Sequence, residues 1–210
     1  MLIIYIPVVN IITLIYKSLT MKHFILLFLA VLLPTIEKDY YEKLSDAAIS
    51  ITKNEVRYDG TYYQIPYPNG DVPKGIGVCT DVVIRSYRKL GADLQQLVHE
   101  DMKKNFSKYP KAWGLKTTDS NIDHRRVPNL QAFFTRHGEV KTISKKPGDY
   151  KPGDLVTWRL SSGVPHIGIV VNKKSFRGNG YQVVHNIGGG QVIDDCLFDY
   201  IITGHYRYKK

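Results

Sequence analysis

The sequence contains few cysteines and none of the common metal-binding spacings. Its 210 residues include two Cys, and neither a CxxC nor an HExxH motif occurs. These absences exclude a disulfide scaffold, a zinc ribbon and a zinc protease of the HExxH type. Glu100-Asp101 beside His99 also lacks zinc-protease spacing. We therefore expect no metal site and no other cofactor.

The chain also lacks the features of a disordered or a nucleic-acid-binding protein. Fifteen Tyr and 23% charged residues argue against disorder, and no internal repeat, low-complexity tract or linker follows residue 36. The net charge of +10 permits an acidic polymer as partner. However, no RNP, zinc-finger or helix-turn-helix signature accompanies the charge, so nucleic acid is not expected. We predict one domain over residues 37–210, acting as a monomer.

The first 36 residues differ from the rest and resemble an export segment. Met21-Lys22-His23 is followed by the apolar run Phe24–Leu33, which matches the basic and hydrophobic regions of a signal peptide. On this interpretation Met21 is the natural start. No A-x-A cleavage site precedes Ile36, so a retained membrane anchor stays open as the alternative. Either form predicts an exported, periplasmic or otherwise extracytoplasmic domain. Because only two basic residues lie in the first 33, that domain keeps a charge of +8.

Hydrophobic periodicity predicts helices first and strands later, which is typical of an α+β domain. Helical spacing and capping residues predict helices over residues 37–54, 79–90, 94–106 and 128–137. Period-two alternation between Gly-rich turns predicts strands over residues 155–160, 166–172, 181–186 and 201–208. Residues 58–77 and 107–127 are expected to be mainly irregular.

Cys79 is the first candidate for chemistry. It lies where a Gly-rich loop enters a predicted helix, and the unpaired N–H groups of a helix start favour a thiolate nucleophile. Two alternatives stay open: a small buried core residue, or one half of a disulfide with Cys196.

His166 is the candidate base for that nucleophile. Alternation along the strand places His166, Gly168 and Val170 on one face, and Gly168 leaves room beside the histidine. The next strand ends in His185 and Asn186, either of which could bond the second ring nitrogen of His166. Because neighbouring residues face opposite sides of a strand, only one of them can do so, and we favour His185.

Several motifs resemble known families. The run from Tyr67 to Val83, YPNGDVPKGIGVCTDVV, resembles the loop and helix start of NlpC-type papain-like cysteine peptidases. The corresponding segments of that family follow in the same order along this chain: Pro-Gly-Asp154, the strand with His166 and the strand that ends in His185. A narrower likeness over residues 55–208 is to an uncharacterised bacterial family, a domain of unknown function. It is carried by three segments: residues 77–88, 121–130 and 202–207.

The resemblance implies a papain-like (NlpC-type) fold, in which a catalytic Cys at a helix start packs on an antiparallel sheet. Cys79 would attack a carbonyl, and His166 would take up and return the proton. His185 or Asn186 would orient the His166 ring. Tyr67 would reach the site with its hydroxyl, with Tyr62 and Tyr63 as alternatives.

The sequence departs from the family pattern at the helix start. Val78, Thr80 and Asp81 stand where the family usually has Asp, Ser and Gly. Asp81 is expected to stabilise the first helical turn, or else to contact substrate. His124-Arg125-Arg126 offers cations for a substrate carboxylate or forms a solvated turn.

These residues predict an exported cysteine peptidase or amidase that hydrolyses peptide bonds in bacterial cell-wall peptidoglycan. A non-catalytic wall- or polyanion-binding module and a thioester acyltransferase are the alternatives.

Overall fold

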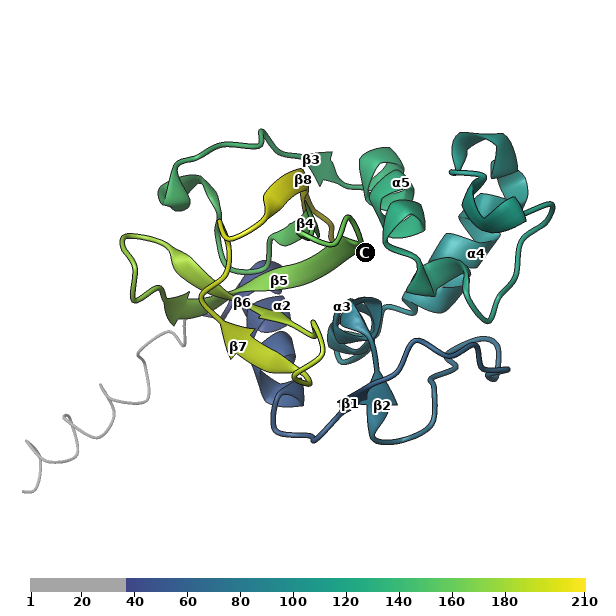
Figure 1. Cartoon of the computed structure of the whole chain (residues 1–210), viewed down its shortest axis with the longest axis horizontal. Coiled ribbons are helices and arrows are strands. Elements are labelled where there is room, and N and C mark those ends of the chain that lie inside the picture. Colours follow the sequence, from purple (N-terminus) through teal and green to yellow (C-terminus); the bar gives the residue numbers. More distant parts are fainter. Residues whose placement is uncertain (1–36) are drawn as a thin grey trace, which may run out of the picture. The chain divides into compact units, whose positions relative to one another are not determined.

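A six-stranded antiparallel sheet forms one layer of the protein, and helices cover one of its faces (Figure 1). The computed structural model describes residues 37–210; the predicted export segment and the Met21 start lie outside the described residues. The strand order is β3-β8-β4-β5-β6-β7. The strands are β3 (Glu139–Val140), β4 (Leu155–Arg159), β5 (Pro165–Lys174), β6 (Tyr181–His185), β7 (Val192–Asp194) and β8 (Ile201–Arg207).

Helices occupy the first half of the described chain, as predicted. They are α2 (Tyr40–Ile51), α3 (Cys79–Arg88), α4 (Leu94–Lys104) and α5 (Val127–His137). Among these residues no helix is long and apolar enough to cross a membrane. The order of helices and strands makes the domain α+β, which confirms the predicted class.

Side-chain caps define the starts of two helices. Asp39 accepts the Glu42 N–H, and Glu42 accepts the Asp39 N–H in return, which is a capping box. Asp93 caps α4 by accepting the N–H groups of Gln95 and Gln96, as its position in the sequence predicts.

Strand β5 separates two hydrophobic clusters. Ile167, Ile169 and Val171 face α2 and α3, whereas Val170 packs on the other face with Val183. This alternation is the one predicted from the sequence, and it puts His166 on the face opposite Ile167.

Short strands account for most differences from the predicted elements. Two short strands, β1 (Arg57–Tyr58) and β2 (Ile76–Gly77), pair in parallel at the two ends of the segment expected to be irregular, residues 58–77. β3 and β7 were also missed, because two or three residues are too few to show a period. The β1–β2 pair matters most, since it leads directly into Cys79.

We expect Gly168→Ala to destabilise the domain by about 1–3 kcal/mol through overpacking. A Cβ at Gly168 would lie 2.9 Å from the Val184 carbonyl oxygen and 3.2 Å from the His185 Cβ. Urea unfolding measures the effect, with Gly148→Ala as the control because a Cβ there meets no atom within 4 Å. Equal stability of the two variants would contradict the close approach of β5 and β6.

Candidate active site

Cys79 is the first residue of α3, and its sulfur lies against the start of β5. The main-chain N–H groups of Ile167, Thr80 and Cys79 itself all lie close enough to the sulfur to favour its thiolate form. First-turn N–H groups have no partner within their own helix, so they are free to point at an anion. The contact with Ile167 puts the thiol beside the residue that follows His166.

The resting thiol is nevertheless neutral. Cys79 is only 6% exposed, and this burial raises the pKa of its thiol to about 12, with the nearby Asp81 carboxylate adding to the rise and the N–H groups opposing it. The helix start was expected to favour a thiolate. The N–H groups of the first turn do lower the pKa of the thiol, as expected, but burial raises it by more.

His166 and His185 form a hydrogen-bonded pair. His166 Nε2 lies 2.8 Å from His185 Nδ1, and the ring centroids are 5.0 Å apart. His166 is 3% exposed, and burial together with His185 lowers the pKa of its imidazole to about 3, so both histidines of the pair are neutral. The bond occupies one ring nitrogen of His166 and leaves Nδ1 for a reaction.

Asn186 faces the opposite side of β6 from His185. Its Nδ2 donates to the Gly77 carbonyl, 3.1 Å away, just before α3. Of the two residues offered by the sequence, His185 therefore contacts His166, and Asn186 secures the loop that carries Cys79.

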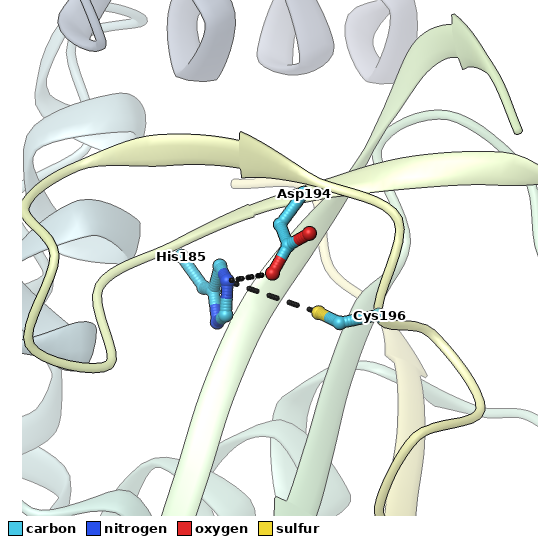
Figure 2. A group of neighbouring side chains, drawn as sticks. All are labelled: His185, Asp194 and Cys196. Carbon is cyan, nitrogen blue, oxygen red and sulfur yellow. Dashed lines mark hydrogen bonds and ion pairs between the residues drawn. The ribbon is translucent and has the colours of Figure 1, made fainter. Parts of the chain in front are cut away.

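The second nitrogen of His185 also has partners. Its Nε2 lies 3.4 Å from an Asp194 carboxylate oxygen and 3.8 Å from Cys196 Sγ (Figure 2). Cys196 is thus paired with a histidine, and both cysteines are free thiols. The alternative of a Cys79–Cys196 disulfide was wrong, since the two residues belong to clusters on different faces of the sheet.

A buried ion pair holds the start of α3. Arg125 Nε and Nη2 donate to the Asp81 carboxylate at 3.0 and 3.1 Å, and Asp81 also accepts the Val78 N–H at 2.7 Å. Both side chains are almost fully buried. The expectation that Asp81 stabilises the start of the helix is confirmed by its bond to the Val78 N–H. The predicted substrate-binding role of Asp81 and Arg125 is corrected, because each uses its charge on the other.

His124 and Arg126 have separate positions. His124 is 1% exposed, and burial lowers the pKa of its imidazole to about 3, so it is not a cation for a substrate carboxylate, contrary to the prediction. The Arg126 guanidinium lies 4.4 Å from the ring centre of Trp113, which is exposed. Arg126 stays a predicted substrate contact.

The tyrosine beside Cys79 is not the predicted one. Tyr67 is 41% exposed and packs edge-on against His99 of α4, with ring centroids 5.3 Å apart. Tyr58 of β1 is equally exposed, but it pairs with Gly77 of β2, just before Cys79, and partial burial of its ring raises the pKa of its phenol. Sequence spacing missed Tyr58 because the parallel β1–β2 pair, which brings it back to the loop, shows no local pattern.

We expect alkylation of Cys79 by iodoacetamide to be slow at pH 7 and to rise about tenfold per pH unit up to pH 11. A rise of the pKa from 9.0 to about 12 lowers the thiolate fraction about 1000-fold, and only the thiolate reacts. Mass spectrometry of a Cys196→Ala chain measures the rate at one thiol, with the urea-unfolded chain as control. A folded rate at pH 7 within tenfold of the unfolded rate would contradict the neutral resting thiol.

Solved structures with similar folds include two kinds of protein. NlpC1 from Trichomonas vaginalis matches 83% of this chain with 17% identity and a TM-score of 0.43, and this chain spans about half (47%) of that protein's length. An N-acetylmuramoyl-L-alanine amidase from Bacteroides uniformis matches 81% of this chain and 99% of its own, with 13% identity and a TM-score of 0.46.

Sequence comparison finds a more similar protein and a family. The uncharacterized protein YijF of Escherichia coli (strain K12) is 51% identical over 166 residues, which cover 79% of this chain and 80% of that protein. The family model described as "Domain of unknown function (DUF1287)" matches residues 45–208, a segment that contains Cys79, His166 and His185. The chain therefore belongs to the DUF1287 family.

Proposed function

We propose that this protein is an exported cysteine hydrolase that cleaves amide bonds in the peptides of cell-wall peptidoglycan. One arrangement carries the proposal: the Cys79 sulfur lies against the main chain of Ile167, the residue after His166 in β5, and His166 Nε2 is 2.8 Å from His185 Nδ1. That the His166 imidazole reaches the sulfur is part of the proposal. A nucleophile, a base and a residue that orients the base are the three groups that acyl transfer from a thiol requires.

Asp194 sets which nitrogens donate and which accept in the hydrogen bonds that join it to His185 and His185 to His166. When its carboxylate accepts the proton of His185 Nε2, Nδ1 of His185 has a free lone pair and accepts the His166 Nε2–H. Neutral His166 then has its remaining lone pair on Nδ1. This tautomer is the one in which His166 can take a proton from Cys79.

The reaction begins from a neutral thiol and a neutral imidazole. His166 Nδ1 removes the thiol proton as the sulfur attacks the amide carbonyl carbon, and the carbonyl oxygen becomes an oxyanion. The N–H groups at the start of α3 are candidate donors to that oxygen. His166 then protonates the leaving amine, and a water molecule, deprotonated by His166, hydrolyses the thioester to release the acid and restore the thiol.

Peptidoglycan fits the charge of the domain and the proposed location. Residues 34–210 have a formal charge of +8, and outside the cytoplasm the cell wall is an abundant acidic polymer. The exposed Trp113 with Arg126 stacked on it offers a contact for a stem-peptide carboxylate.

We expect the full-length chain to release peptide fragments from purified muropeptides, and Cys79→Ala to release none. His185→Ala should lower kcat at least about 100-fold with a smaller change in KM, because it removes the partner that orients the base. Chromatography with mass spectrometry identifies the products. Equal product from the full-length chain and from Cys79→Ala would refute the proposal.

The neutral, buried thiol favours one other function, a non-catalytic module that binds the wall by charge. Such a module would sediment with peptidoglycan sacculi in low salt and would be released by added salt. The Cys79→Ala variant would bind to the same extent as the unmodified chain. Salt-sensitive sedimentation together with no turnover by the unmodified chain would establish this second function in place of the first.

A further inference from the structure

A second group of chemically active side chains lies on the far side of His185 from His166. His185 Nε2, an Asp194 carboxylate oxygen and Cys196 Sγ all lie within 4.8 Å of one another (Figure 2). The proposed reaction uses the Nδ1 side of His185 and does not use the Cys196 thiol. We propose that these three side chains form a Zn²⁺ site that switches the proposed active site off.

The spacing of the donor atoms suits tetrahedral zinc. With Zn–N and Zn–O bonds of about 2.0–2.2 Å and a Zn–S bond of about 2.3 Å, tetrahedral ligands are roughly 3.3–3.4 Å (N to O) and 3.5–3.6 Å (N to S) apart. The distances from His185 Nε2 are 3.4 Å to Asp194 and 3.8 Å to Cys196. The Asp194 oxygen and Cys196 Sγ lie within 4.8 Å of each other. Zinc binding must bring that pair to about 3.6 Å, and the two distances from His185 Nε2 need only small shifts.

The fold holds the three ligands before any metal binds. His185 ends β6, and Asp194 ends β7, which pairs with β6 in antiparallel register. Asp195, between the other two ligands, accepts the Phe176 N–H at 2.8 Å and a Ser175 hydroxyl at 3.0 Å. These bonds fix the turn that carries Cys196, so binding orders little additional chain.

The donor set selects zinc over the hard cations. Imidazole nitrogen and thiolate sulfur favour Zn²⁺, whereas Mg²⁺ and Ca²⁺ require oxygen ligands. One thiolate and one carboxylate also neutralise the two charges of the ion, which suits a site where His185 and Cys196 are buried. Half of the Asp194 side chain is exposed, which leaves an entry path and a fourth position for water.

Zinc on Nε2 reverses the hydrogen bond between the histidines. A zinc-bound imidazole nitrogen has no proton, so neutral His185 carries its proton on Nδ1 and donates it to His166 Nε2. Neutral His166 then carries its own proton on Nδ1 and has no lone pair left for the Cys79 thiol. The net proton change is the loss of the Cys196 thiol proton to solvent. This inhibitory effect rests on the proposed hydrolase function, whereas the metal site itself does not.

Zinc binding to the full-length chain tests the site without any substrate. We expect one Zn²⁺ per chain in titration calorimetry and a thiolate-to-metal charge-transfer absorption with Co²⁺ as probe. Cys196→Ala should lose that absorption, and both Cys196→Ala and Asp194→Ala should bind zinc at least about tenfold more weakly. The matched controls are Cys79→Ala, which removes the other thiol, and Asp199→Ala, which removes a nearby exposed carboxylate; both should bind like the unmodified chain. The proposed site is wrong if Cys196→Ala binds zinc as tightly as the unmodified chain, or if the unmodified chain binds no zinc.

The switch is tested separately on muropeptide turnover, with each rate normalised to the same variant free of metal. Zinc should inhibit the unmodified chain at the concentrations that fill the site and should leave Cys196→Ala at least about tenfold less sensitive. Equal sensitivity of the two chains overturns the switch. If no chain turns over substrate, the proposed function fails, and the titrations still decide the metal site.

Discussion

The contact between the start of α3 and the start of β5 is the constraint on which the candidate site depends. It places the Cys79 sulfur on the Ile167 N–H, next to His166, although the two residues are far apart in the sequence. The Asp81–Arg125 ion pair and the Asn186–Gly77 hydrogen bond hold the loop and first turn in that position. Because both contacts are buried, the geometry of the site is set by the packing of the domain rather than by a flexible loop.

The burial that fixes this geometry also determines its chemistry. A thiol with a pKa of about 12 and an imidazole with a pKa of about 3 are both neutral at pH 7, unlike the thiolate–imidazolium pair of a pre-activated cysteine. Proton transfer must then accompany attack, so the tautomer of His166 decides whether the site can work. That tautomer depends on His185 and, through it, on Asp194. The hydrogen-bond direction between two histidines links the proposed catalytic site to the proposed zinc site.

Local sequence signals predicted the parts of the fold that have local causes. The Asp93 cap and the alternation along β5 follow from local patterns and could be predicted directly. Alternation also limited the partner of His166 to one of His185 and Asn186, but it did not decide between them. The positions of Tyr58 near Cys79 and of Asp194 and Cys196 near His185 could not be predicted. They depend on β1, β2 and β7, strands of two or three residues that show no local pattern. The neutral thiol was missed for a related reason: a helix start is visible in the sequence, whereas the burial that outweighs it comes from tertiary packing.

The central claim is that Cys79 attacks an amide carbonyl and is itself acylated. The most direct measurement is intact-protein and peptide mass spectrometry after an acid quench of the full-length chain during reaction with a stem-peptide substrate. The account predicts a thioester of the acyl fragment on Cys79, and none on that residue when His166 is replaced by Ala. Acylation of Cys196 instead, or turnover with no adduct on Cys79 under any quench, would contradict it.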